Sequence, residues 1–383
     1  MLSYIRPVGE SISTRQDKPI DGYASYNMQF YASGTMALQQ ALSLAKQNAD
    51  SSQPEVLLPA YACPDLISAC VGAGVNAVLV DIESATSPFP SIETIKQHTN
   101  KNTIAIILVN FLGISPKPSL FDAARALGLL IIEDRAQCFI APEEASQLIG
   151  DYVIFSFGKG KPVSLLGGGA LLIKTKPSLI NTSPPSFAND PTSEKHAPEK
   201  KNSKLPWLIR LYNLIVLPFF YYLLMKTPGL SIGATHYHAP KKIAPLDSDR
   251  RSLLRANIDK QYRARSKQTQ KELYTLCEHS TAIQTLSSIK FAPALLRFPM
   301  LCKDLATRDS LVTKLNKHGI GASKMYQTIL PKINGTPLSE TEQQKSYPNA
   351  QQFANRLLTL PCHSGVNTTN LQKMSAIFTK EFN

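Results

Sequence analysis

The stretch that decides the fold is EVLLPAYACPDLISACVGAGVNAVLVDI, from Glu55 to Ile82. It opens with a short apolar run, continues through a helical segment and closes with a second apolar run. Such runs are typical of buried strands, so the order indicates a strand–helix–strand unit. The alternation continues on both sides, with strands expected in TIAIILVNF (103–111), LLIIED (129–134), DYVIFSF (151–157) and GGALLIK (168–174). This pattern predicts an α/β fold with a doubly wound, mostly parallel sheet.

Composition limits the class of protein without naming it. The 383 residues are enough for two domains and a large core. Lys and Arg number 41 against 28 Asp and Glu, and the formal charge of +13 fits phosphorylated substrates, nucleic acid or an anionic membrane surface. The six cysteines show no CxxC and no metal-ligand spacing, so we expect reduced thiols of a cytosolic protein and no metal site. The N-terminus has no apolar h-region, and no signal peptide is expected.

The chain divides into five expected regions. They are a large domain (1–180), a disordered Pro/Ser/Lys-rich insertion (181–204), an apolar segment (205–226), a return to the large domain (227–250) and a small C-terminal α+β domain (251–383). We expect one long charged helix over 250–276. Further helices are expected in 308–322, 349–361 and 368–382.

The apolar segment LPWLIRLYNLIVLPFFYYLLMK (205–226) has an unusual composition. Its uninterrupted apolar part, Leu214–Met225, has 12 residues and contains Pro218, whereas a membrane span needs about 20. Arg210 would be costly at mid-bilayer. Aromatic rings with polar edges, flanked by lysines, favour the headgroup boundary. We predict a helix–break–helix element lying in the cytoplasmic face of a membrane; a core helix or a dimer contact is the alternative.

Candidate chemistry gathers at the ends of two strands. Lys161 stands in a glycine-rich turn after Ser156, and Asp134 ends a strand 27 residues earlier. The first helix opens with Ser33, Gly34 and Thr35, where free amides and the helix dipole can hold a phosphate. A phosphate-loop motif and a dinucleotide fingerprint are both absent. Pyridoxal phosphate needs this set of a lysine, an acid and a helix N-terminus.

Each of these residues also has a simpler interpretation. Lys161 could belong to a basic surface turn, and Lys159 could be solvated or add charge for a phosphate. Asp134 could cap a helix or pair with Arg135. Gln137 could be a solvated polar residue, and the first-helix residues could form an ordinary N-cap.

The ordered set ASGTMAL, VLLPAYACPDL, AVLVDIE, IIEDRAQCF, IFSFGKGKPVSLLGGGALLI and YPNAQQFANRLLTLPCH resembles the DegT–StrS group. These are fold-type-I, pyridoxal-phosphate-dependent sugar aminotransferases, with a large sheet domain and a small C-terminal domain. The resemblance implies that Lys161 is the Schiff-base lysine, that Asp134 partners the ring nitrogen and that Gln137 lies beside the ring hydroxyl. It also implies that Gly34, Thr35, Met36 and Ser156 hold the phosphate.

Two departures from the family pattern concern the cofactor ring and the subunit boundary. Cys63 stands where the family stacks an aromatic side chain, with Tyr61 two residues earlier, so either a small buried Cys63 or a stacking Tyr61 fits. The segment that would reach the partner subunit's cofactor has its nearest match in GATHYH (233–238).

The resemblance implies an aminotransferase that moves an amino group from glutamate to a keto sugar nucleotide in surface-polysaccharide or amino-sugar biosynthesis. Its partners would be these small molecules and a second copy of the chain in a homodimer, with no nucleic acid. We expect it in the cytoplasm, peripheral to the inner face of the membrane. Two alternatives stay open: a pyridoxal-phosphate enzyme acting on a non-sugar or lipid-linked ketone, and a non-catalytic membrane-docking protein.

Overall fold

The chain is described here by a computed structural model. The structure describes residues 3–175, 204–227, 233–264, 267–278 and 283–382, apart from single positions at 18, 19, 21, 234, 287, 288, 290, 291 and 293. The predicted disordered insertion, 181–204, lies outside the described residues except for Lys204.

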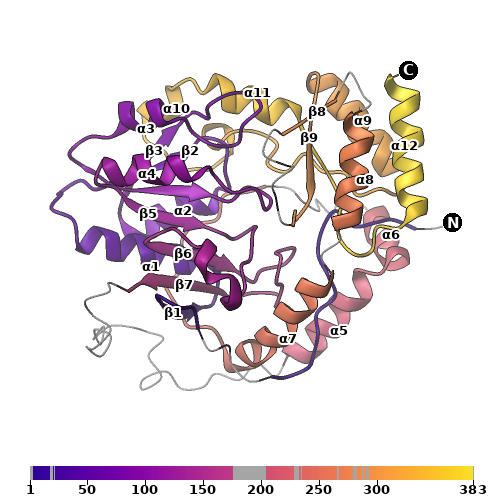
Figure 1. Cartoon of the computed structure of the whole chain (residues 1–383), viewed down its shortest axis with the longest axis horizontal. Helices are drawn as coiled ribbons and strands as arrows, with labels where there is room; N and C mark the ends of the chain where they lie inside the picture. Colours follow the sequence, from indigo (N-terminus) through magenta and orange to yellow (C-terminus); the bar gives the residue numbers. More distant parts are fainter. Residues whose placement is uncertain are drawn as a thin grey trace.

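A seven-stranded sheet forms the larger part of the molecule (Figure 1). Its spatial order is β1-β7-β6-β5-β4-β2-β3, and only β7 runs against its neighbours. The strands are β1 (Tyr26–Tyr31), β2 (Glu55–Pro59), β3 (Asn76–Val80), β4 (Thr103–Val109), β5 (Leu130–Asp134), β6 (Tyr152–Ser156) and β7 (Gly169–Lys174). The predicted mostly parallel, doubly wound sheet is therefore confirmed.

Helices between the strands cover this sheet and close its core. Ser33 accepts a hydrogen bond from the amide of Met36 and so caps α1 (Gly34–Gln47), as its sequence suggests. The other connections carry α2 (Asp65–Ala73), α3 (Ile92–His98), α4 (Pro118–Ala126) and the 3-10 helix η1 (Pro142–Gln147). The central strands β2 and β4 are buried on both faces, as expected where helices cover both sides of a parallel sheet.

A second, three-stranded antiparallel sheet lies beside the first, in the order β10-β9-β8. Its strands are β8 (Ile283–Thr285), β9 (Phe298–Cys302) and β10 (Leu357–Leu360). Around it lie α9 (Leu305–Lys317), α11 (Pro348–Arg356) and α12 (Thr368–Phe382). In contrast, η4 (Leu330–Lys332) and α10 (Glu340–Gln344) lie against the large sheet, where Leu330 donates its amide to the Ala60 carbonyl and Glu342 accepts from the Leu79 amide of β3. The helix predicted over 349–361 is wrong in its second half, because the fully buried LLTL segment pairs with β9 instead.

Over the single long helix predicted for 250–276 the structure describes two helical segments, α7 (Ser248–Ala264) and α8 (Lys267–Glu278), and residues 265 and 266 between them lie outside the described residues. The two helices serve different cores. Leu254 and Ile258 of α7 pack with residues of β6 and β7, whereas Leu273 of α8 packs with the second sheet.

The apolar segment forms α5 (Leu205–Ile215) and α6 (Pro218–Lys226), which confirms the predicted helix–break–helix. No helix of the described residues is by itself long and apolar enough to cross a membrane. The pair α5 and α6 meets those criteria only together, and it is bent by 87°. The five region boundaries drawn from the sequence stay predictions.

Candidate active site

One edge of the large sheet gathers the chemistry-bearing residues. Asp134 ends β5, Ser156 ends the neighbouring β6, and Gly169 begins β7 directly opposite Ser156. The glycine-rich turn 157–168 therefore opens at the carboxyl ends of the parallel strands. The backbone between β1 and Gly34 bridges to the end of that turn. Ligands of doubly wound sheets bind at this edge.

Asp134 presents a buried carboxylate there. It is 6% exposed, and its Oδ1 accepts a hydrogen bond from the Ala136 amide at 2.8 Å. Among the described residues, no other donor reaches this carboxylate. Burial raises the pKa of Asp134, while the Ala136 hydrogen bond and the positive charge of Lys161 oppose that rise. One carboxylate oxygen therefore has capacity for a ligand's hydrogen bond.

Arg135 does not pair with Asp134. Its Nε lies 2.6 Å from Oε1 of Glu133, and both side chains are buried. The other carboxylate oxygen of Glu133 accepts hydrogen bonds from the amides of Ile149 and Gly150, each at 2.9 Å. Alternation along the strand puts Glu133 and Arg135 on the side opposite Asp134. The arginine is therefore a structural partner of Glu133.

Lys161 is half-buried, whereas Lys159 is exposed. The amide of Lys161 donates to the carbonyl of Gly158 at 3.3 Å, which tightens the turn. Within the described chain, the Lys161 ammonium has no hydrogen bond and no ion pair. Its charge acts on both Asp134 and Cys63, whose raised pKa values it opposes. The structure thus places a lysine without a hydrogen-bond partner among the described residues close enough to a buried carboxylate to act on it electrostatically.

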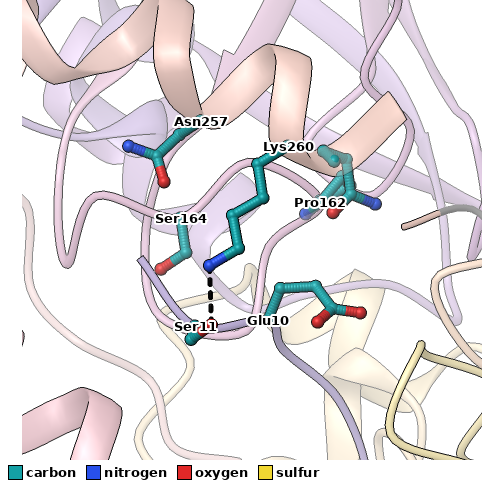
Figure 2. A pocket seen from close by; sticks show the side chains of 7 residues that line it. Glu10, Ser11, Pro162, Ser164, Asn257 and Lys260 are labelled. Atoms are coloured by element: carbon teal, nitrogen blue, oxygen red, sulfur yellow. Dashed lines mark hydrogen bonds between the residues drawn. The ribbon is translucent and has the colours of Figure 1, made fainter. Parts of the chain in front are cut away.

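The turn that follows Lys161 rests on α7 and the N-terminal segment (Figure 2). Pro162 and Ser164 line a small pocket together with Asn257 and Lys260 of α7. The Lys260 ammonium donates to Ser11 Oγ at 2.6 Å, and burial lowers the pKa of Lys260. The turn itself is tied to α7 by Arg250, whose Nε donates to the Leu165 carbonyl at 3.0 Å.

The N-terminus of α1 lies against the end of β6. A Cβ at Gly34 would stand 2.7 Å from Ser156 Cβ and 2.9 Å from its Oγ, so only glycine fits. A Cβ at Gly169 would stand 2.5 Å from the Gly34 nitrogen. Thr35 Oγ1 donates to Asp65 at 3.2 Å, a bond it would have to exchange to hold a phosphate. The Met36 amide donates a hydrogen bond to the Ser33 hydroxyl that caps α1.

Gln137 is held on both ends of its amide. Its Oε1 accepts from the amide of Leu112 at 2.8 Å, and its Nε2 donates to the Tyr326 hydroxyl at 2.7 Å. Gln137 is thus not a solvated residue, since it is 5% exposed. Burial raises the pKa of Tyr326, and Cys63 and Asp134 add to the rise. Tyr326 therefore belongs to this site, although no sequence motif singled it out.

Tyr61 and Cys63 have different surroundings. The Tyr61 ring packs edge-on against Phe353 at 5.2 Å and Tyr326 at 5.5 Å, and its hydroxyl donates to the Tyr326 carbonyl at 3.1 Å. Cys63 is partly exposed, and burial and Asp65 raise its pKa to about 11. Tyr61 thus belongs to an aromatic cluster with Phe353 and Tyr326, and the neutral Cys63 thiol interacts electrostatically with Lys161 and Asp134.

These residues fit pyridoxal phosphate. An unengaged lysine, a buried carboxylate with a free oxygen and a glycine-built helix N-terminus meet at one edge, and these are the three features the cofactor requires. The described residues contain no cluster of three or more His, Cys, Asp or Glu able to hold a metal ion. The site residue roles stay predictions.

The chain belongs to the DegT/DnrJ/EryC1/StrS aminotransferase family, which it matches over residues 29–182 and 253–379. It is therefore an enzyme of the aminotransferase class, and aminotransferases of this family depend on pyridoxal phosphate. A comparison with curated proteins found no significant match.

Solved aminotransferase structures share the fold. PseC of Helicobacter pylori, described as involved in pseudoaminic acid biosynthesis, superposes with a TM-score of 0.64 at 15% identity, covering 97% of this chain and 99% of that one. The sugar aminotransferase CalS13 of Micromonospora echinospora gives 0.64 at 15% identity, covering 92% and 87%. A 3-amino-5-hydroxybenzoic acid synthase gives 0.65 at 15% identity, covering 92% and 86%. The likeness confirms the fold-type-I architecture.

Proposed function

We propose that this chain is a pyridoxal-phosphate enzyme that transfers an amino group from glutamate to the keto group of a sugar nucleotide. The observation that carries the proposal is the Lys161 ammonium, without a hydrogen bond or ion pair among the described residues, acting electrostatically on the buried Asp134 carboxylate at the sheet edge. Membership of an aminotransferase family supports the reaction class.

Five residues would hold the cofactor. Lys161 Nζ would bind it covalently, Asp134 would accept a hydrogen bond from its ring nitrogen, and the α1 N-terminus at Gly34, with Ser156, would take its phosphate. Gln137, fixed by Leu112 and Tyr326, would stand beside its ring hydroxyl. The bound cofactor would supply an aldehyde carbon that carries the amino group from donor to acceptor and a ring that withdraws electrons from the reacting carbon.

Lys161 would also move the proton. Once its Nζ is free, it would take the proton from Cα of the amino donor and return one to the carbon of the acceptor. The buried Asp134 would keep its charge next to the ring nitrogen. The aromatic cluster of Tyr61, Tyr326 and Phe353 would exclude water from that side.

We further propose a homodimer with sites at the subunit boundary, on the strength of the family resemblance. Sedimentation velocity at micromolar concentration tests it. A fully active monomer would contradict it.

The acceptor is proposed from chemistry and likeness. A net charge of +13 favours an anionic substrate such as a sugar nucleotide. PseC and CalS13 are named for sugar chemistry, whereas the 3-amino-5-hydroxybenzoic acid synthase is named for an aromatic product. A non-sugar ketone is therefore the second candidate.

The experiment is an amino-transfer assay with purified enzyme, cofactor and glutamate. A panel of keto sugar nucleotides is compared with non-sugar ketones, and 2-oxoglutarate release is measured together with the amino product. We expect turnover with at least one sugar nucleotide. Turnover confined to non-sugar ketones would overturn the acceptor but leave the cofactor chemistry standing.

A further inference from the structure

The helix pair α5–α6 exposes an unusual amount of apolar surface. On the described part of the chain, eleven large apolar side chains are exposed, and nine of them lie between Trp207 and Met225. Trp207 alone is 62% exposed. We call these nine side chains the apolar face. Nine exposed large apolar side chains concentrated on one helix pair indicate an interaction site.

The apolar face is held outward by the opposite side of the same helices. Leu205 and Ile209 are buried against α7 and the core around β6. Asn213 exchanges two hydrogen bonds with the backbone of Ile12, at 2.7 and 2.8 Å. The Tyr221 ring packs on Tyr4 at 5.7 Å. Specific contacts on the buried side therefore fix the orientation of the helices, and the same orientation exposes the apolar face to solvent.

A helix at the surface of a water-soluble protein turns its polar side outward. Helix α5 does the reverse along Leu208, Leu211 and Leu214, which lie three residues apart and share one stripe. A single charged residue, Arg210, stands among them. The exposed stripe is suited to an apolar medium.

The helices are too short and too bent to cross a bilayer. Eleven residues of α5 and nine of α6 span about 16 Å and about 14 Å, against about 30 Å of hydrocarbon. The 87° bend at Pro218 keeps them from acting as one rod. An element of this shape can lie in the plane of an interface.

The charged residues within the helix pair and its sequence flanks have one sign. From Lys200 to Leu246 the sequence contains seven Lys and Arg and no Asp or Glu. Of these, Lys204, Arg210, Lys226, Lys241 and Lys242 are exposed in the structure. Lys226 lies 5.7 Å from the centre of the Tyr222 ring, at the end of α6. Lys204 and Lys226 lie at the two ends of the helix pair and Arg210 lies within α5, so positive charge is carried beside the apolar side chains and complements an anionic lipid headgroup layer.

We propose that α5 and α6 dock this enzyme on an anionic lipid surface, with the apolar face inserted at the headgroup boundary. A second copy of the chain is a poorer occupant, because a symmetric contact through this face would bring the cations of both copies together. Arg297 interacts electrostatically with Tyr221 of α6 and also with Tyr326, which holds Gln137.

Trp207 gives a direct test, because it is the only tryptophan of the chain. The full-length enzyme is mixed with vesicles of phosphatidylcholine alone or of phosphatidylcholine with phosphatidylglycerol, and tryptophan emission and flotation are followed. We expect a blue shift and flotation with the anionic vesicles, both weakened by salt. An unchanged emission spectrum and a protein that stays in the soluble fraction at low salt would overturn the proposal.

A matched pair of double variants shows which surface binds. Leu214→Gln with Leu223→Gln changes the apolar face at positions 43% and 46% exposed, and Val71→Gln with Leu305→Gln changes positions of the same exposure elsewhere. We expect the first variant to lose at least about tenfold in vesicle affinity and the second to bind as the wild type does. Equal binding by both would overturn the proposal. The proposal would also be overturned if the Leu214→Gln, Leu223→Gln variant became monomeric while its vesicle binding stayed unchanged. The apolar face would then be a contact between copies of the chain.

Discussion

Replacing Asp134 with Asn separates the role of its charge from its place in the fold. Asn keeps an oxygen that can accept the Ala136 hydrogen bond and fits nearly the same volume. It removes the negative charge that we assign to the cofactor's ring nitrogen. We therefore expect the protein to fold, to bind pyridoxal phosphate more weakly and to turn over far more slowly.

The magnitudes follow from the surroundings of Asp134. A hydrogen bond to a charged group contributes about 1.5–3 kcal/mol, so cofactor affinity should fall about 10- to 150-fold. Loss of preorganised charge at a buried site costs about 10²- to 10³-fold in kcat. The cofactor-free variant should unfold at the same temperature as the wild type or a higher one at neutral pH. This is because burial raises the pKa of Asp134, so its ionised form costs stability above the folded-state pKa, and that cost disappears toward pH 3.8.

The assay combines a cofactor titration followed by absorbance, single-turnover kinetics and thermal unfolding without cofactor. Glu133→Gln is the control, because Glu133 is adjacent in sequence and buried but pairs with Arg135. It should lose about 3–5 kcal/mol of folding stability, since Arg135 is left buried without its partner. Near-normal turnover by the Asp134→Asn enzyme at saturating cofactor would refute the reasoning.

Three further variants probe the surroundings of the site. Tyr326→Phe removes the hydroxyl that accepts the hydrogen bond of Gln137 Nε2. It should lower kcat about tenfold and shift the cofactor absorbance, as measured by kinetics and spectra. An unaltered spectrum would count against a place for Tyr326 in the site. Gly34→Ala puts a Cβ 2.7 Å from Ser156 Cβ and should weaken cofactor binding at least about tenfold, so unchanged affinity would argue against the phosphate position. Burial lowers the pKa of His363 to about 4, so the folding stability present above pH 6.5 should be lost as the pH falls toward 4. The His363→Gln variant should therefore show a flatter dependence of melting temperature on pH. A pH profile identical to that of the wild type would contradict this assignment to His363.

Much of the large domain follows from local pattern. The sequence predicts strand ends such as that of β5 because an apolar run stops there at polar residues, and Asp134 is a candidate site residue for that reason. The N-cap at Ser33 is likewise a local signal. Lys161 stood out through its glycine-rich surroundings. Each of these predictions depends on residues close together in the sequence.

The missed features depend on contacts between distant parts of the chain. Tyr326 reaches Gln137 across 189 positions, and no local motif marks it. Helices α7 and α8 pack on two different cores, which periodicity along the sequence does not reveal. Arg135 could have paired with either neighbouring acid. Arg135 pairs with Glu133 because residues two apart on a strand point to the same side, whereas Asp134 points to the opposite side.

The central claim is that Lys161 holds pyridoxal phosphate covalently, and borohydride reduction tests it most directly. The purified, cofactor-loaded protein is reduced, digested and mapped by mass spectrometry, with Lys161→Arg and Lys159→Arg enzymes treated in parallel. We expect the pyridoxyl group on Lys161 in the wild type and the Lys159→Arg enzyme, and none in the Lys161→Arg enzyme. A wild-type protein that takes up no cofactor, or that carries it on another lysine, would contradict the account.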